Sequence, residues 1–141
     1  MPTRDEIAAF LAAEFPQSDC VIRAAGGRGA TVSLAVGHAH LRPGATVSGP
    51  TLMAVADMAL YVAILAEIGI VPLAVTTSLT INFLRRPAAA RDIVGVCKLL
   101  KLGRTLAVGE VALFSEGDDA PVAHVVGTYS IPPSAARGDV N

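Results

Sequence analysis

The spacing of hydrophobic positions in the first third of the chain predicts one helix and two strands. Apolar residues at helical spacing over residues 4–14 predict a short amphipathic helix, which ends before Pro16. Residues 20–24 predict a weak strand, and residues 30–36 alternate polar and apolar positions as a half-buried strand does. The glycine-rich run 26–29 separates these two strands and predicts a turn.

A second helix is predicted over residues 49–68, where nearly every position is apolar or small. Ser48 is a suitable N-cap and Gly69 a suitable stop. A helix that is hydrophobic on all sides is usually buried in the middle of a domain. The run is also long enough to cross a membrane, but the charge of Asp57 and the start at Gly49-Pro50 favour a buried helix and no membrane partner.

Strand-like segments dominate the rest of the chain, and turn signals separate them. A lone apolar helix among consecutive strands predicts an α+β protein in which an antiparallel sheet packs against that helix. We expect a single domain over residues 1–141, with a core of about 20–132 and a frayed tail after Pro132-Pro133. The four predicted strands are 73–84, 92–101, 105–115 and 122–131.

Composition excludes some function classes. The 141 residues are 52% hydrophobic with a net charge of −1, which argues against a nucleic-acid-binding protein. Cys20 and Cys97 have no metal-type spacing and are interpreted as free thiols in a reducing compartment. With early charges and no long apolar run at the start, we expect no signal peptide and a cytoplasmic location.

Asp57 is the strongest candidate for chemistry from residue types alone. It is the only charged residue between Arg42 and Glu67, and it lies within the apolar helix. A carboxylate in such a place must be hydrogen-bonded, paired or protonated, because burying a bare charge is costly. Buried acids of this kind cluster at functional sites.

Four sequence features together resemble one family. Gly49 is followed eight residues later by Asp57, and residues 75–88 read Val-Thr-Thr-Ser-Leu-Thr-Ile-Asn-Phe-Leu-Arg-Arg-Pro-Ala. Gly103-Arg104 precedes a strand, and residues 123–129 read Ala-His-Val-Val-Gly-Thr-Tyr. Over roughly residues 30–131 the chain resembles the acyl-CoA thioesterases of the hotdog fold, phenylacetate-pathway (PaaI-like) branch, in which a curved antiparallel sheet wraps a central helix.

The resemblance implies a catalytic set. The amide of Gly49 at the helix start would polarise the thioester carbonyl, since a helix N-terminus offers free N–H groups and a positive dipole end. Asp57 would act as general base for water or as nucleophile through an anhydride, and Thr76 matches a position that holds the attacking water. In this family Gly49 and Asp57 would come from different subunits of a homodimer or homotetramer.

The resemblance also implies an acyl-CoA substrate and no metal or redox cofactor, coenzyme A being part of the substrate. Ser48 could hydrogen-bond the substrate or only cap the helix. Arg85, Arg86 and Arg104 flank strand ends, where cations could meet the phosphates of coenzyme A. Arg42 could do the same or pair with Asp57. Met53, Met58, Leu60 and Val62 suggest an apolar acyl or aryl pocket.

Two departures from the family pattern leave alternatives open. Where the family helix begins with His-Gly-Gly, this chain reads Ser48-Gly49-Pro50, and Arg42 replaces an Asn or Gln. A dehydratase or hydratase of acyl thioesters would need His38 or His40 to reach Asp57. A non-catalytic acyl-CoA-binding protein is the third interpretation.

Overall fold

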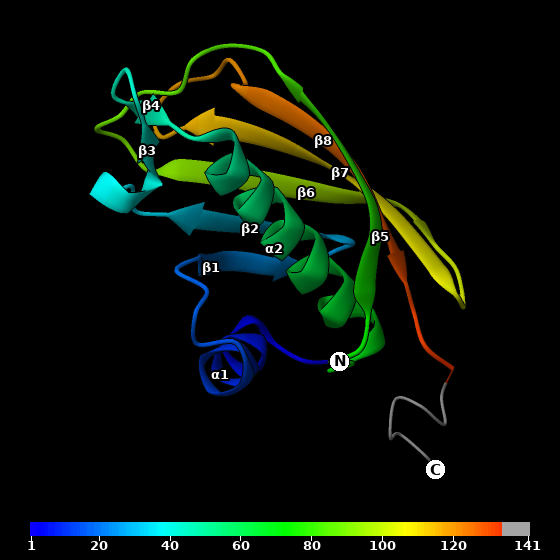
Figure 1. Ribbon diagram of the computed structural model, residues 1–141. Helices are drawn as coiled ribbons and strands as arrows, with labels where there is room; N and C mark the ends of the chain where they lie inside the picture. Colours follow the sequence, from blue (N-terminus) through cyan, green and yellow to red (C-terminus); the bar gives the residue numbers. More distant parts are fainter. Residues whose placement is uncertain (134–141) are drawn as a thin grey trace.

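A curved sheet of six antiparallel strands wraps around one long helix, α2 (Gly49–Ile68), in the computed structural model, which describes residues 1–133 (Figure 1). The strand order is β1-β2-β6-β7-β8-β5, and a shorter helix, α1 (Arg4–Glu14), lies beside β1. The strands are β1 (Val21–Gly26), β2 (Gly29–Leu34), β5 (Val75–Phe83), β6 (Ile93–Leu102), β7 (Leu106–Ser115) and β8 (Ala123–Ser130).

Helix α2 begins and ends at the residues that the sequence predicts. The Ser48 hydroxyl accepts a hydrogen bond from the Thr51 N–H at 3.3 Å. Pro50 occupies the first turn, where a backbone N–H would have no hydrogen-bond partner within the helix. The helix stops at Gly69, whose φ of 99° favours glycine.

The sheet approaches α2 closely where two glycines face it. Gly109 of β7 pairs with Gly127 of β8, and Leu60 of α2 packs over the pair. A Cβ atom would lie 2.7 Å from a Leu60 methyl at Gly109 and 2.5 Å from one at Gly127, so neither position has room for a side chain.

Helix α2 is long and apolar enough to cross a membrane, but 67% of its most apolar stretch is buried inside the protein. Packing in the core therefore accounts for its hydrophobicity.

Strand β5 forms one edge of the sheet and carries one of the residues that contact Asp57. It pairs with β8 in a register that sets Thr76 directly opposite Tyr129. The register shifts between Thr76 and Ser78, which leaves Thr77 in a bulge. Directly opposed residues of an antiparallel pair project from the same face, and here that face meets α2, because both side chains contact Asp57.

The structure confirms the predicted architecture of the hotdog type, with two helices and the six long strands close to their expected bounds. The interpretation of residues 37–47 as a loop was incomplete. This stretch contains a short 3₁₀ helix, His38–His40, and a small hairpin of β3 (Leu41–Arg42) and β4 (Thr46–Val47). Two-residue strands are too short to show alternation in the sequence. The predicted frayed tail lies largely outside the described residues.

Candidate active site

The Asp57 side chain is held by two hydroxyl groups from the sheet. The Thr76 hydroxyl donates to Asp57 Oδ1 at 2.6 Å, and the Tyr129 phenol donates to the same oxygen at 2.7 Å. The second oxygen, Oδ2, has no hydrogen-bond partner within residues 1–133. The carboxyl group is half-buried, as its position on an apolar helix predicts, and one of its oxygens remains available for chemistry.

Tyr129 is a site residue that the sequence motifs did not single out. Its side chain is only 3% exposed. Burial, and then the nearby charge of Asp57, raise the pKa of the phenol far above its usual range. The phenol therefore stays protonated and acts as a hydrogen-bond donor to Asp57. Its place at the end of the matched segment 123–129 was the only signal in the sequence.

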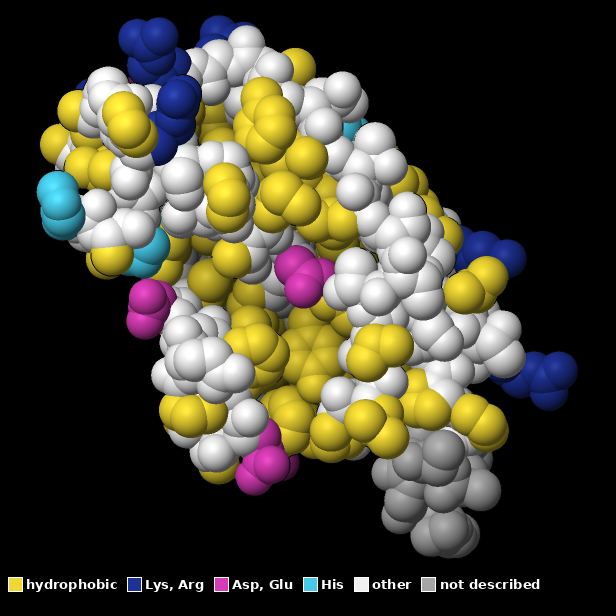
Figure 2. All heavy atoms as spheres, in the orientation of Figure 1, with side chains coloured by type: hydrophobic (Ala, Val, Ile, Leu, Met, Phe, Trp, Pro, Cys, Tyr) yellow, Lys and Arg dark blue, Asp and Glu magenta, His cyan; other side chains and the backbone are white. Residues whose placement is uncertain are grey.

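Asp57 lies at a cavity of about 680 Å³ with a mainly apolar lining. Figure 2 shows this hollow on the face over α2, with hydrophobic side chains at its base and a carboxylate at its edge. Four of the six aromatic residues of the chain line it, although aromatic residues are scarce overall. The charged residues of the lining are Glu14, Asp19 and Asp57, so this cavity carries acidic groups and no Lys or Arg.

Thr76 contributes to the site through Asp57. Its hydroxyl hydrogen is directed to Oδ1, while its oxygen keeps lone pairs that can accept a hydrogen bond from water. The structure thus brings Thr76 and Asp57 together, and the role of Thr76 in holding water stays a prediction.

Substitution of Thr76 by Ala is expected to lower kcat roughly 10- to 100-fold, because a hydrogen bond to a charged group is lost. Thr77→Ala is the matched control: it removes a neighbouring hydroxyl that donates to the Thr128 carbonyl oxygen at 3.3 Å and does not contact Asp57. Initial rates of the thioester hydrolysis that the sequence resemblance implies measure both variants. Equal effects of the two substitutions would show that Thr76 has only a structural role.

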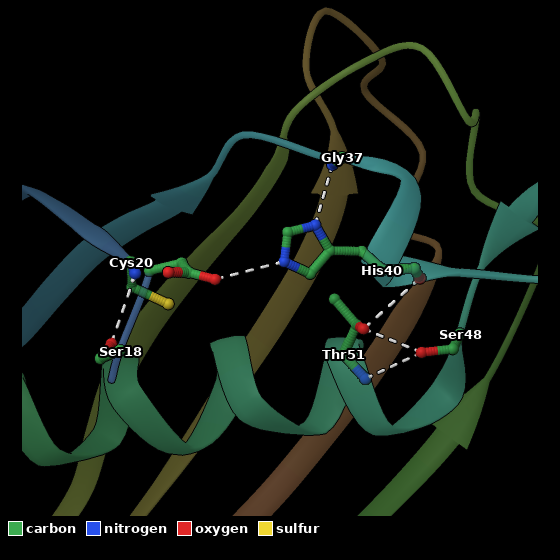
Figure 3. Close-up of polar contacts among 7 residues, drawn as sticks. Ser18, Cys20, Gly37, His40, Ser48 and Thr51 are labelled. Carbon is green, nitrogen blue, oxygen red and sulfur yellow. Dashed lines mark hydrogen bonds and ion pairs between the residues drawn. The ribbon is translucent and has the colours of Figure 1, made fainter. Parts of the chain in front are cut away.

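The start of α2 presents one free backbone donor. The Ser48 N–H donates to the His40 carbonyl oxygen at 2.9 Å, Pro50 has no N–H, and the Thr51 N–H is capped by Ser48 (Figure 3). The Gly49 N–H has no hydrogen-bond partner within the described part of the chain. The Ser48 hydroxyl also contacts the Thr51 hydroxyl at 2.8 Å, so its observed role is that of a cap.

Gly49 lies in a second hollow, a groove of about 460 Å³ whose charged lining residues are Arg42, Arg85 and Arg86. Figure 2 shows Lys and Arg side chains grouped at this end of the molecule, near β3 and β4, and away from the apolar hollow. Arg42 forms no ion pair with Asp57 among residues 1–133, so that predicted alternative is not observed.

Arg104 does not join the other three arginines. It lies in the exposed turn between β6 and β7, at the end of the sheet where Leu106 pairs with Ser130. Arg85 and Arg86 follow β5 at the opposite end, where Phe83 pairs with Ala123. The eight residues of β8 separate the two ends by about 26 Å. One subunit therefore does not gather all four arginines at one site.

Gly49 and Asp57 are also apart within one subunit. They are eight residues apart on the same helix, which corresponds to about 12 Å along the axis. The cavity of Asp57 and the groove of Gly49 share no lining residue among those described. At this separation, one carbonyl group cannot lie about 3 Å from both the Gly49 N–H and the Asp57 carboxyl group of the same chain.

His40 lines the cavity of Asp57, whereas His38 is exposed. The Gly37 N–H donates to His40 Nδ1 at 2.8 Å (Figure 3), so Nε2 carries the proton of the neutral ring. The Nε2 atom lies 3.4 Å from Asp19 Oδ2. No hydrogen bond joins His40 to Asp57 within residues 1–133.

The apolar residues expected near the site divide into two groups. Met58 lines the cavity. Leu60 and Val62 are fully buried in the core, so the expectation was wrong for these two. Met53 is partly exposed and lies outside the cavity lining. The cavity instead draws its aromatic lining from α1, α2 and β8 and from the residue after α1: Phe10, Phe15, Tyr61 and Tyr129.

Comparison with known proteins gives one matching family and several similar solved structures. Residues 44–122 match the sequence model of the thioesterase superfamily. A solved structure of a candidate thioesterase from Silicibacter sp. TM1040 is 49% identical, with a TM-score of 0.86, over 93% of this chain and 92% of that one. None of the functionally curated proteins matches the chain significantly.

Two more distant structures share the fold. A point mutant of the phenylacetic acid degradation protein PaaI from Thermus thermophilus is 25% identical, with a TM-score of 0.71, over 88% of this chain and 99% of that one. Thioesterase superfamily member 2 of zebrafish is 24% identical, with a TM-score of 0.81, over 94% of this chain and its own full length.

Proposed function

The chain belongs to the thioesterase superfamily, and we propose that it hydrolyses an acyl- or aryl-CoA thioester to the free acid and coenzyme A. The observation that carries the proposal is the Asp57 carboxyl group at an apolar cavity, with one oxygen fixed by two hydroxyls and the other free. A carboxylate positioned in this way can accept a proton from water or attack a carbonyl carbon.

In the reaction with Asp57 as base, Oδ2 removes a proton from water as the water oxygen bonds to the thioester carbon. The carbonyl oxygen becomes an oxyanion, and the Gly49 N–H donates to it at the helix N-terminus. The oxyanion collapses, the C–S bond breaks, and the leaving thiolate takes the proton that Asp57 had accepted from water, which regenerates the carboxylate. With Asp57 as nucleophile, Oδ2 bonds to the thioester carbon and expels the thiolate, which leaves a mixed anhydride between Asp57 and the acyl group. Water then hydrolyses this anhydride to the free acid and the Asp57 carboxylate.

We propose that Gly49 and Asp57 of one active site come from two subunits. The distance of about 12 Å between them along one helix supports this. The edge strand β5 supports it as well, because it exposes unpaired backbone and, with the residue that follows it, three large apolar side chains: Val75 and Leu84, each 50% exposed, and Phe83, 56% exposed. A second copy can cover such an edge.

The two hollows differ in charge, which supports a division of the substrate between them. The groove with Arg42, Arg85 and Arg86 suits the phosphates of coenzyme A, since guanidinium groups bind phosphate through charge-assisted hydrogen bonds. The cavity with its aromatic lining suits an apolar acyl or aryl group. Arg104 would take part only if it comes from another subunit.

The test is an assay of thiol release with acyl-CoAs of different chain length and aromaticity. We expect release of free coenzyme A thiol with a kcat/KM of at least about 10⁴ M⁻¹ s⁻¹ for the best substrate. Absence of release from every acyl-CoA tested would refute the proposed hydrolysis.

Thiol release separates hydrolysis from the two alternatives, and an assay of double-bond absorbance separates the alternatives from each other. His40 lines the same cavity as Asp57, which is the feature that favours a dehydratase or hydratase. Such an enzyme would change the absorbance of a conjugated thioester without releasing thiol. A non-catalytic acyl-CoA-binding protein, which the Ser48 replacement favours, would show binding with neither signal.

A cytoplasmic location is part of the proposal. Both cysteines are free thiols in the described structure. Burial raises the pKa of the Cys97 thiol to about 12, so this residue is an unreactive member of the core. Unpaired cysteines are typical of proteins from a reducing compartment.

A further inference from the structure

Tyr129 contacts Asp57 at two atoms. Its phenol oxygen lies 2.7 Å from Asp57 Oδ1 and 3.1 Å from the Asp57 backbone carbonyl oxygen. A phenol has one hydrogen to donate, and the shorter distance and the charge both favour the carboxylate as its acceptor. The buried Tyr129 phenol therefore links the Asp57 side chain to strand β8, and it lies beside the backbone of helix α2 at Asp57.

The phenol itself has little freedom to move. The Tyr129 ring stacks on the Tyr61 ring, with 6.1 Å between centroids and 21° between planes, and the Tyr61 hydroxyl donates to the Pro72 carbonyl oxygen at 3.2 Å. Thr76, directly opposite Tyr129 in the strand pair, donates to the same carboxylate oxygen. Two donors from neighbouring strands thus converge on Oδ1, and none within residues 1–133 contacts Oδ2.

We infer that Tyr129 is a positioning residue for Asp57: its phenol, together with the Thr76 hydroxyl, holds Oδ1 and leaves Oδ2 as the oxygen that reacts. This inference rests on the proposed thioesterase function for its kinetic consequences. The high pKa of the buried phenol agrees with it, because the group remains a donor throughout the working pH range.

The test is Tyr129→Phe, which removes one oxygen atom and keeps the buried ring. We expect kcat at neutral pH to fall roughly 10- to 100-fold, with KM changed by less than about threefold. Thr76→Val removes the other donor to Oδ1 and is expected to lower kcat in the same way.

The matched control is Tyr61→Phe. It also removes a phenol oxygen from the same aromatic stack, but that oxygen contacts Pro72 and not Asp57. Its loss is expected to act on KM, because Tyr61 lines the cavity, whereas loss of the Tyr129 hydroxyl acts on kcat. An unchanged kcat in Tyr129→Phe, or an equal fall of kcat in Tyr61→Phe, would overturn the inference.

A second measurement does not depend on activity. The ¹³C signal of the Asp57 side-chain carboxyl group, identified with the Asp57→Asn variant, reports the hydrogen bonding of that group in the folded protein. At neutral pH we expect this signal to move in Tyr129→Phe and to stay at its wild-type position in Tyr61→Phe, and an unmoved signal in Tyr129→Phe would overturn the inference. If the wild type releases no thiol from any acyl-CoA, the proposed function fails while this signal still decides the contact between Tyr129 and Asp57.

Discussion

Asp57→Asn is expected to lower kcat for thioester hydrolysis by at least about a hundredfold, because a general base or nucleophile is lost. The substitution keeps the shape of the side chain. An amide oxygen can still accept hydrogen bonds from Thr76 and Tyr129 at the position of Oδ1. The amide nitrogen at the position of Oδ2, in contrast, neither accepts a proton nor attacks a carbonyl. The measurement is the initial rate of thiol release with the best wild-type substrate.

Glu67→Gln is the control for removing a negative charge from α2. Glu67 lies near the end of the same helix, accepts a hydrogen bond from the Arg28 N–H at 2.9 Å, and is outside the cavity lining. We expect its kcat to stay close to that of the wild type. Both variants should retain the cooperative unfolding of the wild type. An Asp57→Asn variant that keeps most of the wild-type kcat would remove Asp57 from the mechanism.

Asp57 could be found from the sequence because its signal is local. A single charge among the apolar and small helical positions 49–66 is visible by inspection, and so are the cap at Ser48 and the stop at Gly69. The long strands could be predicted for the same reason, since each carries its own pattern of apolar residues and is bounded by turn signals.

Tyr129 could not be found in this way, because its role depends on register. It contacts Asp57 only because β5 pairs with β8 so that Thr76 stands opposite Tyr129, with a bulge at Thr77. Moving that register by one residue would turn the side chain to the other face of the sheet. Strand pairing between residues so far apart along the chain leaves no mark in the local sequence.

The positions of the arginines also depend on strand pairing, which the local sequence does not reveal. Arg85, Arg86 and Arg104 all flank predicted strand ends, and the sequence does not say at which end of the sheet each lies. The strand order places the first two beside Gly49 and the third at the far end. Leu60 was expected near the acyl pocket, but Gly109 and Gly127 open a space for it in the core.

Mixing two inactive variants is expected to restore activity if each site combines Gly49 of one subunit with Asp57 of the other. Gly49→Val alone should be inactive or nearly so. A Cβ atom at Gly49 would lie 3.1 Å from the Phe83 ring, so a larger side chain displaces the ring and crowds the free amide. The protein should first show a mass of at least twice 14.4 kDa by light scattering.

In a hybrid of one Asp57→Asn chain and one Gly49→Val chain, one site holds both intact groups and the other holds both defects. Random exchange of equal amounts makes half of the dimers hybrids, so about a quarter of wild-type activity should return. The control mixes Asp57→Asn chains with chains carrying both substitutions, a pairing that forms no intact site. If mass spectrometry demonstrates subunit exchange and no activity returns, Gly49 and Asp57 do not act together across the interface.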